Sequence, residues 1–259
     1  MELLVHLLVS NYTDHIPLYR LEQIAARVGV DLPRQKLSRW VEHTALLLRS
    51  IHDRLRARIL ASDYVQIDET QVKVLNPDCS GHAAQAYLWT YLSSLSEAIV
   101  FDFDLSRSRG NLCEFFPPDW REVLQSEGYE AYGSFLRDKP RIVHAVRAEL
   151  RQRESVPILE RLHEQFNLIA QSELPQSRPG KAAAYVLARW GTLTRYAESG
   201  MGHVLIDQNS FERSICPTKL GAKNWLYIGH PDAGWRSAVT YSITGTCKLL
   251  KVNPTDYLT

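Results

Sequence analysis

Three acidic residues, far apart along the chain, have the types and settings needed to act together in chemistry. Asp68 closes an apolar run, Glu127 stands in a short polar turn, and Glu212 lies in the polar segment 207–213. Carboxylate oxygens suit Mg²⁺ and Mn²⁺. Two such ions about 4 Å apart can activate a water or hydroxyl and stabilise charge at phosphorus. The three residues therefore indicate a two-metal centre for phosphoryl transfer.

Each acidic residue also has a plainer interpretation. Asp68 could accept a turn hydrogen bond at the end of a strand, and Glu127 could be an ordinary turn residue. Glu212 could pair with Arg213 or another base on a solvated helix face. Glu69 is expected to point away from Asp68, because successive side chains of a strand alternate.

Two other patterns resemble known catalytic motifs but are incomplete. The segment 163–167 begins like the helix of a zinc protease, yet its fifth residue is Asn167 where a second histidine would be needed. Gly180-Lys181 lacks the earlier glycine and the following Ser or Thr of a phosphate-binding loop. We therefore expect neither a zinc site nor a nucleotide-binding loop of these kinds.

The elements that must position the acidic residues begin with two helices. Apolar residues at helical spacing predict a helix from about residue 18 that Gly29 ends. A longer helix is expected from Pro33 to about residue 59. Its Arg and Lys residues lie mostly off the apolar stripe, which fits either a solvated face or a surface that contacts phosphates.

Short strand-like runs follow, and they alternate later with helices. The expected strands are 64–67, 86–92, 98–103, 123–124 and 142–143. A short helix is expected after the linker 106–110, and another at 129–136. The first three strands suggest an antiparallel meander, and the first strand is expected to end at Asp68. The order βββ-α-β-α-β is that of an α/β protein with a ribonuclease-H-like mixed sheet flanked by helices.

The remainder of the chain is predicted to be mainly helical. A helical insertion is expected from 146 to about 199, interrupted at Pro157 and at 174–180. A helix capped by Asp207 or Asn209 should carry Glu212. A lysine-rich loop at 219–225 and a closing helix at about 234–250 complete the chain. The expected divisions are a helical region 1–62, a first part of the core 63–145, the helical insertion 146–200, and the completion of the core 201–259.

Composition sets the broad class of the protein. The 259 residues are 45% hydrophobic and 23% charged, as in ordinary globular proteins, and the net charge of +1 is low for a dedicated DNA-binding module. The four cysteines form no Cys-x-x-Cys pair, which argues against a zinc ribbon and fits a reducing cytoplasm. We expect neither a signal peptide nor a membrane span.

Several ordered motifs point to one family. The most specific are Asp207-Gln208-Asn209-Ser210-Phe211-Glu212-Arg213 and Gly221-Ala222-Lys223-Asn224-Trp225-Leu226-Tyr227-Ile228-Gly229. Further motifs lie at 8–20, 37–41, 68–75, 88–91, 124–132, 241–243 and 252–258. In these residues the chain resembles transposases of the insertion-sequence-66 family, which are DDE-type enzymes with a ribonuclease-H-like core.

The resemblance implies roles for particular residues. Asp68, Glu127 and Glu212 would be the three catalytic carboxylates and the ligands of two Mg²⁺ (or Mn²⁺) ions. The family has Asp at the second position, where this chain has Glu127. His144 and Arg147 match a family segment that contains His and Arg, although His144 could also be a core histidine at a strand end.

The expected function is that of a DNA transposase catalytic domain. Water would cleave the transposon end, and the freed 3′-hydroxyl would attack target DNA. Arg213, Lys219 and Lys223 would contact phosphates, and the chain would form a homo-oligomer on DNA without contacting a membrane. The alternative is a truncated, catalytically impaired remnant that binds DNA or a partner, since family members usually carry upstream DNA-binding and zinc-binding segments.

Overall fold

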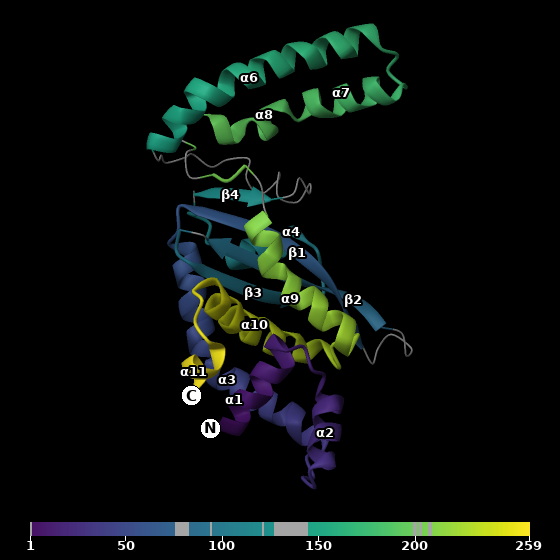
Figure 1. Ribbon diagram of the computed structural model, residues 1–259, viewed down its shortest axis with the longest axis vertical. Helices are drawn as coiled ribbons and strands as arrows, with labels where there is room; N and C mark the ends of the chain where they lie inside the picture. The colour runs from purple at the N-terminus through teal and green to yellow at the C-terminus, as the bar shows by residue number, and fades with distance from the viewer. Residues whose placement is uncertain are drawn as a thin grey trace. The chain divides into compact units, whose positions relative to one another are not determined.

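The structure is a computed structural model that describes most of the chain. The described residues are 2–75, 83–93, 95–120, 122–126, 145–198, 201, 204–206 and 209–259, without the side chains of 109, 145–150 and 210. They belong to two compact units. We call Met1–Pro140 with Gln208–Thr259 the sheet unit, and Arg141–Asp207 the helical unit. Figure 1 labels their elements.

A four-stranded mixed sheet forms the centre of the sheet unit. Its strands are β1 (Tyr64–Leu75), β2 (Ala83–Ser93), β3 (Ala98–Asp104) and β4 (Val123–Ser126). The strand order is β3-β2-β1-β4, with β1, β2 and β3 antiparallel and β4 parallel to β1 (Figure 1). This order and these directions match the expected ribonuclease-H-like sheet of an α/β protein.

Strand β1 is longer than the sequence suggested. It continues past Asp68 to Leu75, so the expected strand end at Asp68 is wrong. The second half of the strand alternates, with Val72 and Val74 buried and Gln71 and Lys73 exposed. Such alternation is the mark of a strand with one face in the core. Asp68 therefore lies inside β1, directly opposite Thr90 of β2.

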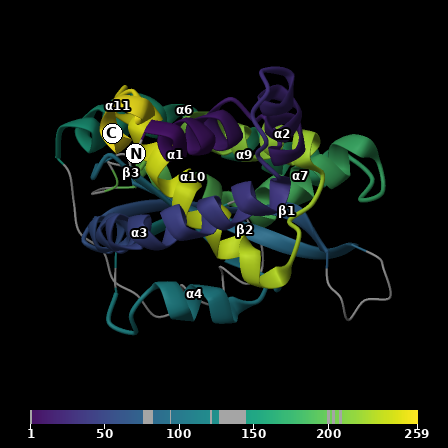
Figure 2. The same cartoon turned by 90° about the horizontal axis from the view of Figure 1, so that it is seen from below.

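The two faces of the sheet are covered by different helices, as Figure 2 shows. On one face, Val72 and Leu88 pack against Phe211 of α9 (Asn209–Trp225) and Tyr241 of α10 (Gly234–Leu249). On the other face, Ile67 and Trp89 pack in a cluster with the residues of α4 (Arg109–Phe115). Because burial of apolar surface is the main stabilising term, these two contacts fix the layers of the sheet unit.

The N-terminal region is helical, as predicted. It contains α1 (Glu2–Leu8), η1 (Val9–Thr13), α2 (Leu18–Arg27) and α3 (Arg34–Leu60). Gly29 follows α2 with a φ of 76°, a left-handed conformation that glycine adopts without steric cost. Leu37 of α3 lies in the core cluster on the α9 face, and Ile59 of the same helix lies in the cluster on the α4 face.

The helical unit is built from α6 (Ala145–Ser172), α7 (Arg178–Ala188), α8 (Trp190–Leu193) and η2 (Arg195–Ala197). The expected interruption at Pro157 is wrong, because α6 runs through it without a break. Proline weakens a helix by removing one backbone hydrogen bond, but the surrounding residues here favour helix strongly enough to continue. The second expected break is confirmed, and Ser177 Oγ accepts a hydrogen bond from Gly180 N at the start of α7.

The C-terminal elements return to the sheet unit. The expected lysine-rich loop at 219–225 is wrong, because these residues form the second half of α9. The closing helix α10 is confirmed, and η3 (Pro231–Ala233) and α11 (Pro254–Leu258) flank it. The helix expected at 129–136 and the strand expected at 142–143 lie outside the described residues. Within the part of the chain that the structure describes, no helix is long and apolar enough to cross a membrane.

Candidate active site

Asp68 lies at the centre of a polar group on the sheet face that α9 covers. Gln66 and Thr70 are two residues before and after it on β1, so they share its face. Thr90 of β2 is its direct cross-strand neighbour. Asp68 is half-buried, whereas Gln66, Thr70 and Thr90 are buried. We call these four residues the β1–β2 polar group.

The three neighbours of Asp68 carry polar atoms that find no partner. Both side-chain polar atoms of Gln66 and the hydroxyls of Thr70 and Thr90 are buried without a hydrogen bond among the described residues. Such atoms normally cost about 1–3 kcal/mol each when they stay unpaired. Their concentration around one carboxylate indicates a place where water, an ion or a substrate supplies the missing contacts.

Glu212 occupies the first turn of α9 and is exposed to solvent. The residue before it, Phe211, is fully buried in the core on the same sheet face as Asp68, and Ile215 lies beside it. These two anchors fix the rotation of the helix and leave Glu212 at the margin of the buried face. The unpaired N–H groups of a first helical turn also favour a negative charge there.

The far end of α9 is fixed to β1. Shortly after the helix ends, Ile228 forms a parallel bridge with Val74, and its N–H donates to Lys73 O. From Trp225 back to Glu212 the helix rises about 20 Å. From Val74 back to Asp68 the strand spans about 20 Å. In the view of Figure 1, α9 runs from near β4 toward the end of the β1–β2 hairpin.

The third acidic residue, Glu127, lies outside the described residues. The residue before it, Ser126, ends β4 and pairs with Ile67, the residue before Asp68. Among the described residues, no group of three or more His, Cys, Asp or Glu side chains is close enough to hold a metal ion. The structure thus gives the settings of Asp68 and Glu212 and the strand that leads to Glu127.

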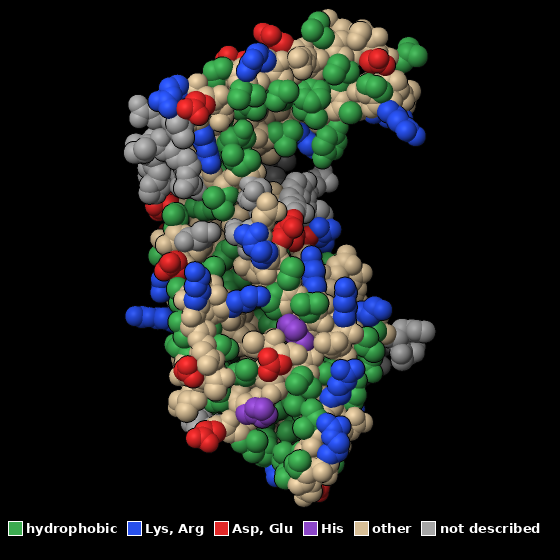
Figure 3. Space-filling view, viewed as in Figure 1, with side chains coloured by type: hydrophobic (Ala, Val, Ile, Leu, Met, Phe, Trp, Pro, Cys, Tyr) green, Lys and Arg blue, Asp and Glu red, His purple; other side chains and the backbone are tan. Residues whose placement is uncertain are grey.

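The basic residues expected to contact DNA are exposed on α9. Lys219 and Lys223 follow Glu212 by seven and eleven residues, which puts all three on one side of the helix. Arg213 is also exposed, and it lies about 100° around the helix axis from Glu212. Figure 3 shows Lys and Arg side chains along this part of the surface. A helix with this pattern presents positive charge in a row that begins beside a carboxylate.

Charged residues on the opposite sheet face make contacts within the fold. Glu69, as expected, points away from Asp68 and forms an ion pair with Arg107. His52 of α3 is buried, lies 3.0 Å from Phe101 O through Nε2, and is 3.8 Å from Asp102. Burial raises the pKa of Asp102, and the charges of His52 and Arg56 oppose that rise. These groups connect β1 and β3 to neighbouring segments.

Two expected site residues are not placed by the structure. His144 lies outside the described residues, and Arg147 is on α6 with a side chain that is not described. The sequence reasoning also missed Gln66, Thr70 and Thr90. The first two could have been found from the pattern Gln66-x-Asp68-x-Thr70, which puts polar residues on one face of an otherwise apolar strand. Thr90 required the strand register.

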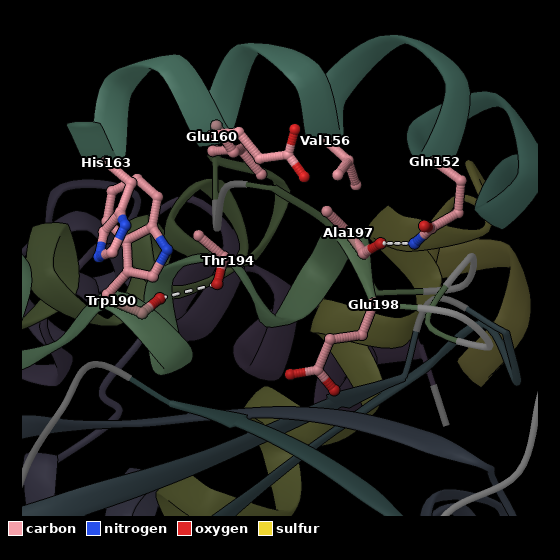
Figure 4. A pocket seen from close by; sticks show the side chains of 9 residues that line it. Gln152, Val156, Glu160, His163, Trp190, Thr194, Ala197 and Glu198 are labelled. Atoms are coloured by element: carbon pink, nitrogen blue, oxygen red, sulfur yellow. Dashed lines mark hydrogen bonds between the residues drawn. The ribbon is translucent and has the colours of Figure 1, made fainter. Parts of the chain in front are cut away.

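The helical unit contains a cavity of about 300 Å³ between α6 and the segment from α8 to η2 (Figure 4). Trp190 and His163 line one part, with ring centroids 4.7 Å apart. Glu160 and Glu198 also line it, and Gln152 reaches the Ala197 carbonyl at its edge. Two carboxylates disfavour an anionic ligand, so this cavity is a poor place for a phosphate.

Comparison with protein families identifies the class to which this fold and site belong. The family described as Transposase IS66 family matches residues 1–146 and 136–236. The chain therefore belongs to the IS66 family of transposases, the proteins of a class of mobile elements.

The chain is also similar to individual curated proteins. Three curated proteins of Sinorhizobium fredii, the uncharacterized proteins y4qI, y4jD and y4hP, are 27%, 26% and 20% identical to this chain. The matches cover 99% of this chain but 58%, 60% and 57% of the relatives, so the chain spans less than two thirds of their length. No solved structure matches the chain significantly.

Proposed function

We propose that this chain is the catalytic domain of a DNA transposase that cleaves and transfers DNA strands of an insertion sequence with the help of divalent metal ions. The observation that carries the proposal is the β1–β2 polar group. It places a half-buried carboxylate among buried polar atoms that lack partners, on the sheet face that also carries α9 and Glu212. Membership of the IS66 transposase family gives the reaction class.

Asp68, Glu127 and Glu212 would supply the oxygen ligands. The similar lengths of α9 from Trp225 to Glu212 and of β1 from Val74 to Asp68, with the bridge of Ile228 to Val74 shortly after the helix, support a close approach of Glu212 to Asp68. The pairing of Ser126 with Ile67 supports the same for Glu127. When bound, two Mg²⁺ or Mn²⁺ ions would supply an activated hydroxyl and stabilise charge at phosphorus.

The protein residues around this site would orient the DNA. Lys219 and Lys223 would contact phosphates beside Glu212, and Arg213 would do so from the neighbouring side of α9. Gln66, Thr70 and Thr90 would hydrogen-bond to ion-bound water or to the DNA backbone, which would satisfy their unpaired atoms. The expected roles of His144 and Arg147, and the formation of a homo-oligomer, stay predictions.

The longer side chain of Glu127, compared with Asp, affects the expected rate of catalysis. The sequence resemblance expects Asp here, and Glu moves the carboxylate by roughly 1 Å or more, enough to cost about 100-fold in rate. We therefore expect slow catalysis by the natural chain and faster catalysis by Glu127→Asp. An inert remnant that only binds DNA would respond to neither Glu127→Asp nor the metal.

The test combines metal binding with DNA cleavage. Titration calorimetry with Mn²⁺ and nicking of supercoiled plasmid in Mn²⁺ need no knowledge of the transposon ends. Asp68→Asn and Glu212→Gln should each lower nicking by more than about 100-fold, beyond the range typical of supporting residues, and should weaken Mn²⁺ binding. Glu164→Gln, an exposed carboxylate of α6, is the matched control and should change neither measurement.

Two results would contradict the proposal. One is a folded protein that binds no Mn²⁺ and cleaves no DNA, both as the natural chain and as Glu127→Asp. The other is cleavage that survives both Asp68→Asn and Glu212→Gln, which would assign the activity to other residues.

A further inference from the structure

A second cavity, of about 400 Å³, lies in the sheet unit between η1, α9, α10 and the residues that follow α10. Tyr12, Phe101 and Tyr241 form its buried part. Lys248 and Lys251 are exposed at its rim. This volume falls within the range of small-molecule sites in proteins. The cavity is separate from the β1–β2 polar group and has no role in the proposed cleavage.

The buried part of the cavity is aromatic. Tyr12 and Tyr241 meet edge to face with ring centroids 5.0 Å apart, and Phe101 lies 5.9 Å from Tyr241. These rings are almost wholly buried, with Tyr241 2% and Phe101 1% exposed, so they offer a ligand apolar contact at the floor of the cavity and no open stacking face.

Two buried polar atoms lie beside these rings, Tyr241 Oη and His15 Nδ1, and both residues line the cavity. His15 Nδ1 has no hydrogen-bond partner among the described residues. Both atoms lie near one point beside Gly221, where an added Cβ would collide with Tyr241 Oη and come within 3.6 Å of His15 Nδ1. The indole nitrogen of Trp225 is close to the same point, and its hydrogen bond to Tyr241 opposes the rise that burial causes in the Tyr241 pKa.

These two atoms suit a ligand that both donates and accepts hydrogen bonds. A tyrosine hydroxyl can do either. Burial lowers the pKa of His15, and Lys248 adds to this effect while Asp14 opposes it. His15 is therefore neutral over a wider pH range than an exposed histidine, and a neutral imidazole has one donor and one acceptor nitrogen. The edges of nucleobases carry donors and acceptors in this way.

Two residues at the cavity have a left-handed backbone conformation. Within the described parts of the chain, four non-glycine residues have a positive φ, and two of them, His15 at 58° and Lys251 at 57°, line this cavity. Lys251 follows the end of α10, where Val252 N donates to Cys247 O, and His15 follows η1, where Ile16 N donates to Ser10 O. Both are the left-handed residues with which helices commonly end, and they fix the two chain segments that border the cavity.

The charge at the rim selects an anion. Lys248 and Lys251 line the cavity, and the residues that line it include no Asp or Glu. This is the reverse of the cavity in the helical unit, where Glu160 and Glu198 line the wall. Two ammonium groups beside an aromatic wall fit a ligand with a planar ring at one end and a phosphate at the other.

We propose that this cavity binds one nucleotide, with its base against Tyr241 and Phe101 and its phosphate at Lys248 and Lys251. The nucleotide could be free or could be an unpaired residue of a DNA strand, since both present the same base and phosphate. The proposal concerns binding alone. It therefore stands even if the protein proves unable to cleave DNA.

The first test compares ligands by titration calorimetry on the full chain. The probes are thymidine monophosphate, thymidine, inorganic phosphate and a 5′-phosphorylated trithymidylate. We expect the monophosphate to bind at least 10-fold more tightly than either thymidine or phosphate, because only it contacts both the wall and the rim. Tighter binding of the trinucleotide assigns the site to unpaired DNA, and equal binding assigns it to a free nucleotide.

The second test uses variants. Lys248→Gln should weaken monophosphate binding by roughly 5- to 10-fold through the lost charge. Tyr241→Phe keeps the ring and should weaken binding by roughly 3- to 10-fold, while circular dichroism and the melting temperature show that the protein stays folded. Lys181→Gln, an exposed lysine of α7, is the charge-matched control and should leave binding unchanged.

The proposal is overturned if the folded natural chain binds no nucleotide at millimolar concentration. It is also overturned if inorganic phosphate binds as tightly as the monophosphate, or if neither Lys248→Gln nor Tyr241→Phe changes the affinity. Nucleotide binding without plasmid nicking would refute the proposed cleavage and leave this inference intact.

Discussion

Thr90 and Thr246 are both buried threonines, yet their hydroxyls have different surroundings. Thr246 Oγ1 lies 3.2 Å from Ile99 O and 3.3 Å from Ile99 N, so it bonds the backbone of β3. Thr90 Oγ1 is fully buried across from Asp68 and has no partner among the described residues. The first hydroxyl stabilises the fold, whereas the second is kept at a cost that we attribute to function.

Replacing each threonine by valine separates these roles. Thr246→Val should lower the free energy of unfolding by about 1–2 kcal/mol, because it removes satisfied hydrogen bonds. Thr90→Val should leave it unchanged or raise it by up to about 1 kcal/mol, because it removes an unpaired buried hydroxyl. Urea unfolding of both variants at one pH checks this. An equal loss in the two variants would show that Thr90 is satisfied in the folded protein.

For single residues, the sequence indicated which side chains could bind a metal ion but not which residues surround them in the fold. Asp68 and Glu212 could be chosen because carboxylates in such settings suit divalent ions. Thr90 could not be chosen, since it becomes a neighbour of Asp68 only through the register of β1 and β2. Cross-strand register depends on the packing of whole faces, and single residues do not reveal it.

Helix α9 joins the two parts of the proposed site. Its buried residues Phe211 and Ile215 pack on the sheet, and its exposed side carries Glu212, Lys219 and Lys223. The sequence predicted the first half of this helix and mistook the second half for a loop, because Gly221 and the lysines lack an apolar stripe of their own. Packing of Trp225 against the core on the α9 face outweighs that weak local preference.

The exposed lysines of α9 give a prediction about salt. If Lys219 and Lys223 contact phosphates, Lys219→Gln and Lys223→Gln should each reduce the slope of log affinity for duplex DNA against log salt concentration by about 0.9. Fluorescence anisotropy at several salt concentrations measures it. Lys73→Gln, which removes an exposed lysine from the opposite sheet face, should leave the slope unchanged. If all variants have the same slope as the natural chain, α9 does not contact the DNA phosphates.

The other helices and strands also show which elements a local sequence pattern can and cannot predict. The helices α2, α3 and α10 were predicted because long apolar stripes recur at helical spacing. Strand β1 was predicted too short, because the Asp68-Glu69-Thr70 run resembled a strand end. Its partner β2 supplies the hydrogen bonds that extend it to Leu75.

The two compact units of the molecule differ in how much they bury. The sheet unit holds large buried side chains on both sheet faces. Few described residues of the helical unit are buried, and they are mostly small: Arg151, Gly180, Ala183, Ala197, Met201 and Val204. The guanidinium of Arg151 compensates in part by donating to the carbonyls of Tyr196, Met201 and Val204.

Amide hydrogen exchange should therefore be slower in the sheet unit than in the helical unit. Amide protons of β1, β2, β3 and α10 should exchange slowest, near the rate set by global unfolding, because they lie in or against the large cores. Amides of α6 and α7 should exchange at least about 100-fold faster through local opening. Mass spectrometry on the intact chain measures both. Equal protection in the two sets would show that the helical unit draws stability from contacts beyond its own small core.

The comparisons add to this division. The alignment with the relative y4qI extends over 314 positions, more than the 259 residues of this chain, so the relative has residues without a counterpart here. The family match is broken into two stretches that overlap at 136–146, and the sheet unit gives way to the helical unit between Pro140 and Arg141.

Because the bridge between Ile228 and Val74 fixes the C-terminal end of α9, the position of Glu212 depends on the number of residues in the helix. With its C-terminal end fixed, inserting one residue between Lys219 and Trp225 would turn Glu212 by about 100° and move it by about 1.5 Å. Inserting seven residues would nearly restore its direction but shift it by about 10 Å along the helix axis. A single insertion or deletion within this helix would therefore turn Glu212 away from its present direction, even if every side chain of the helix were kept.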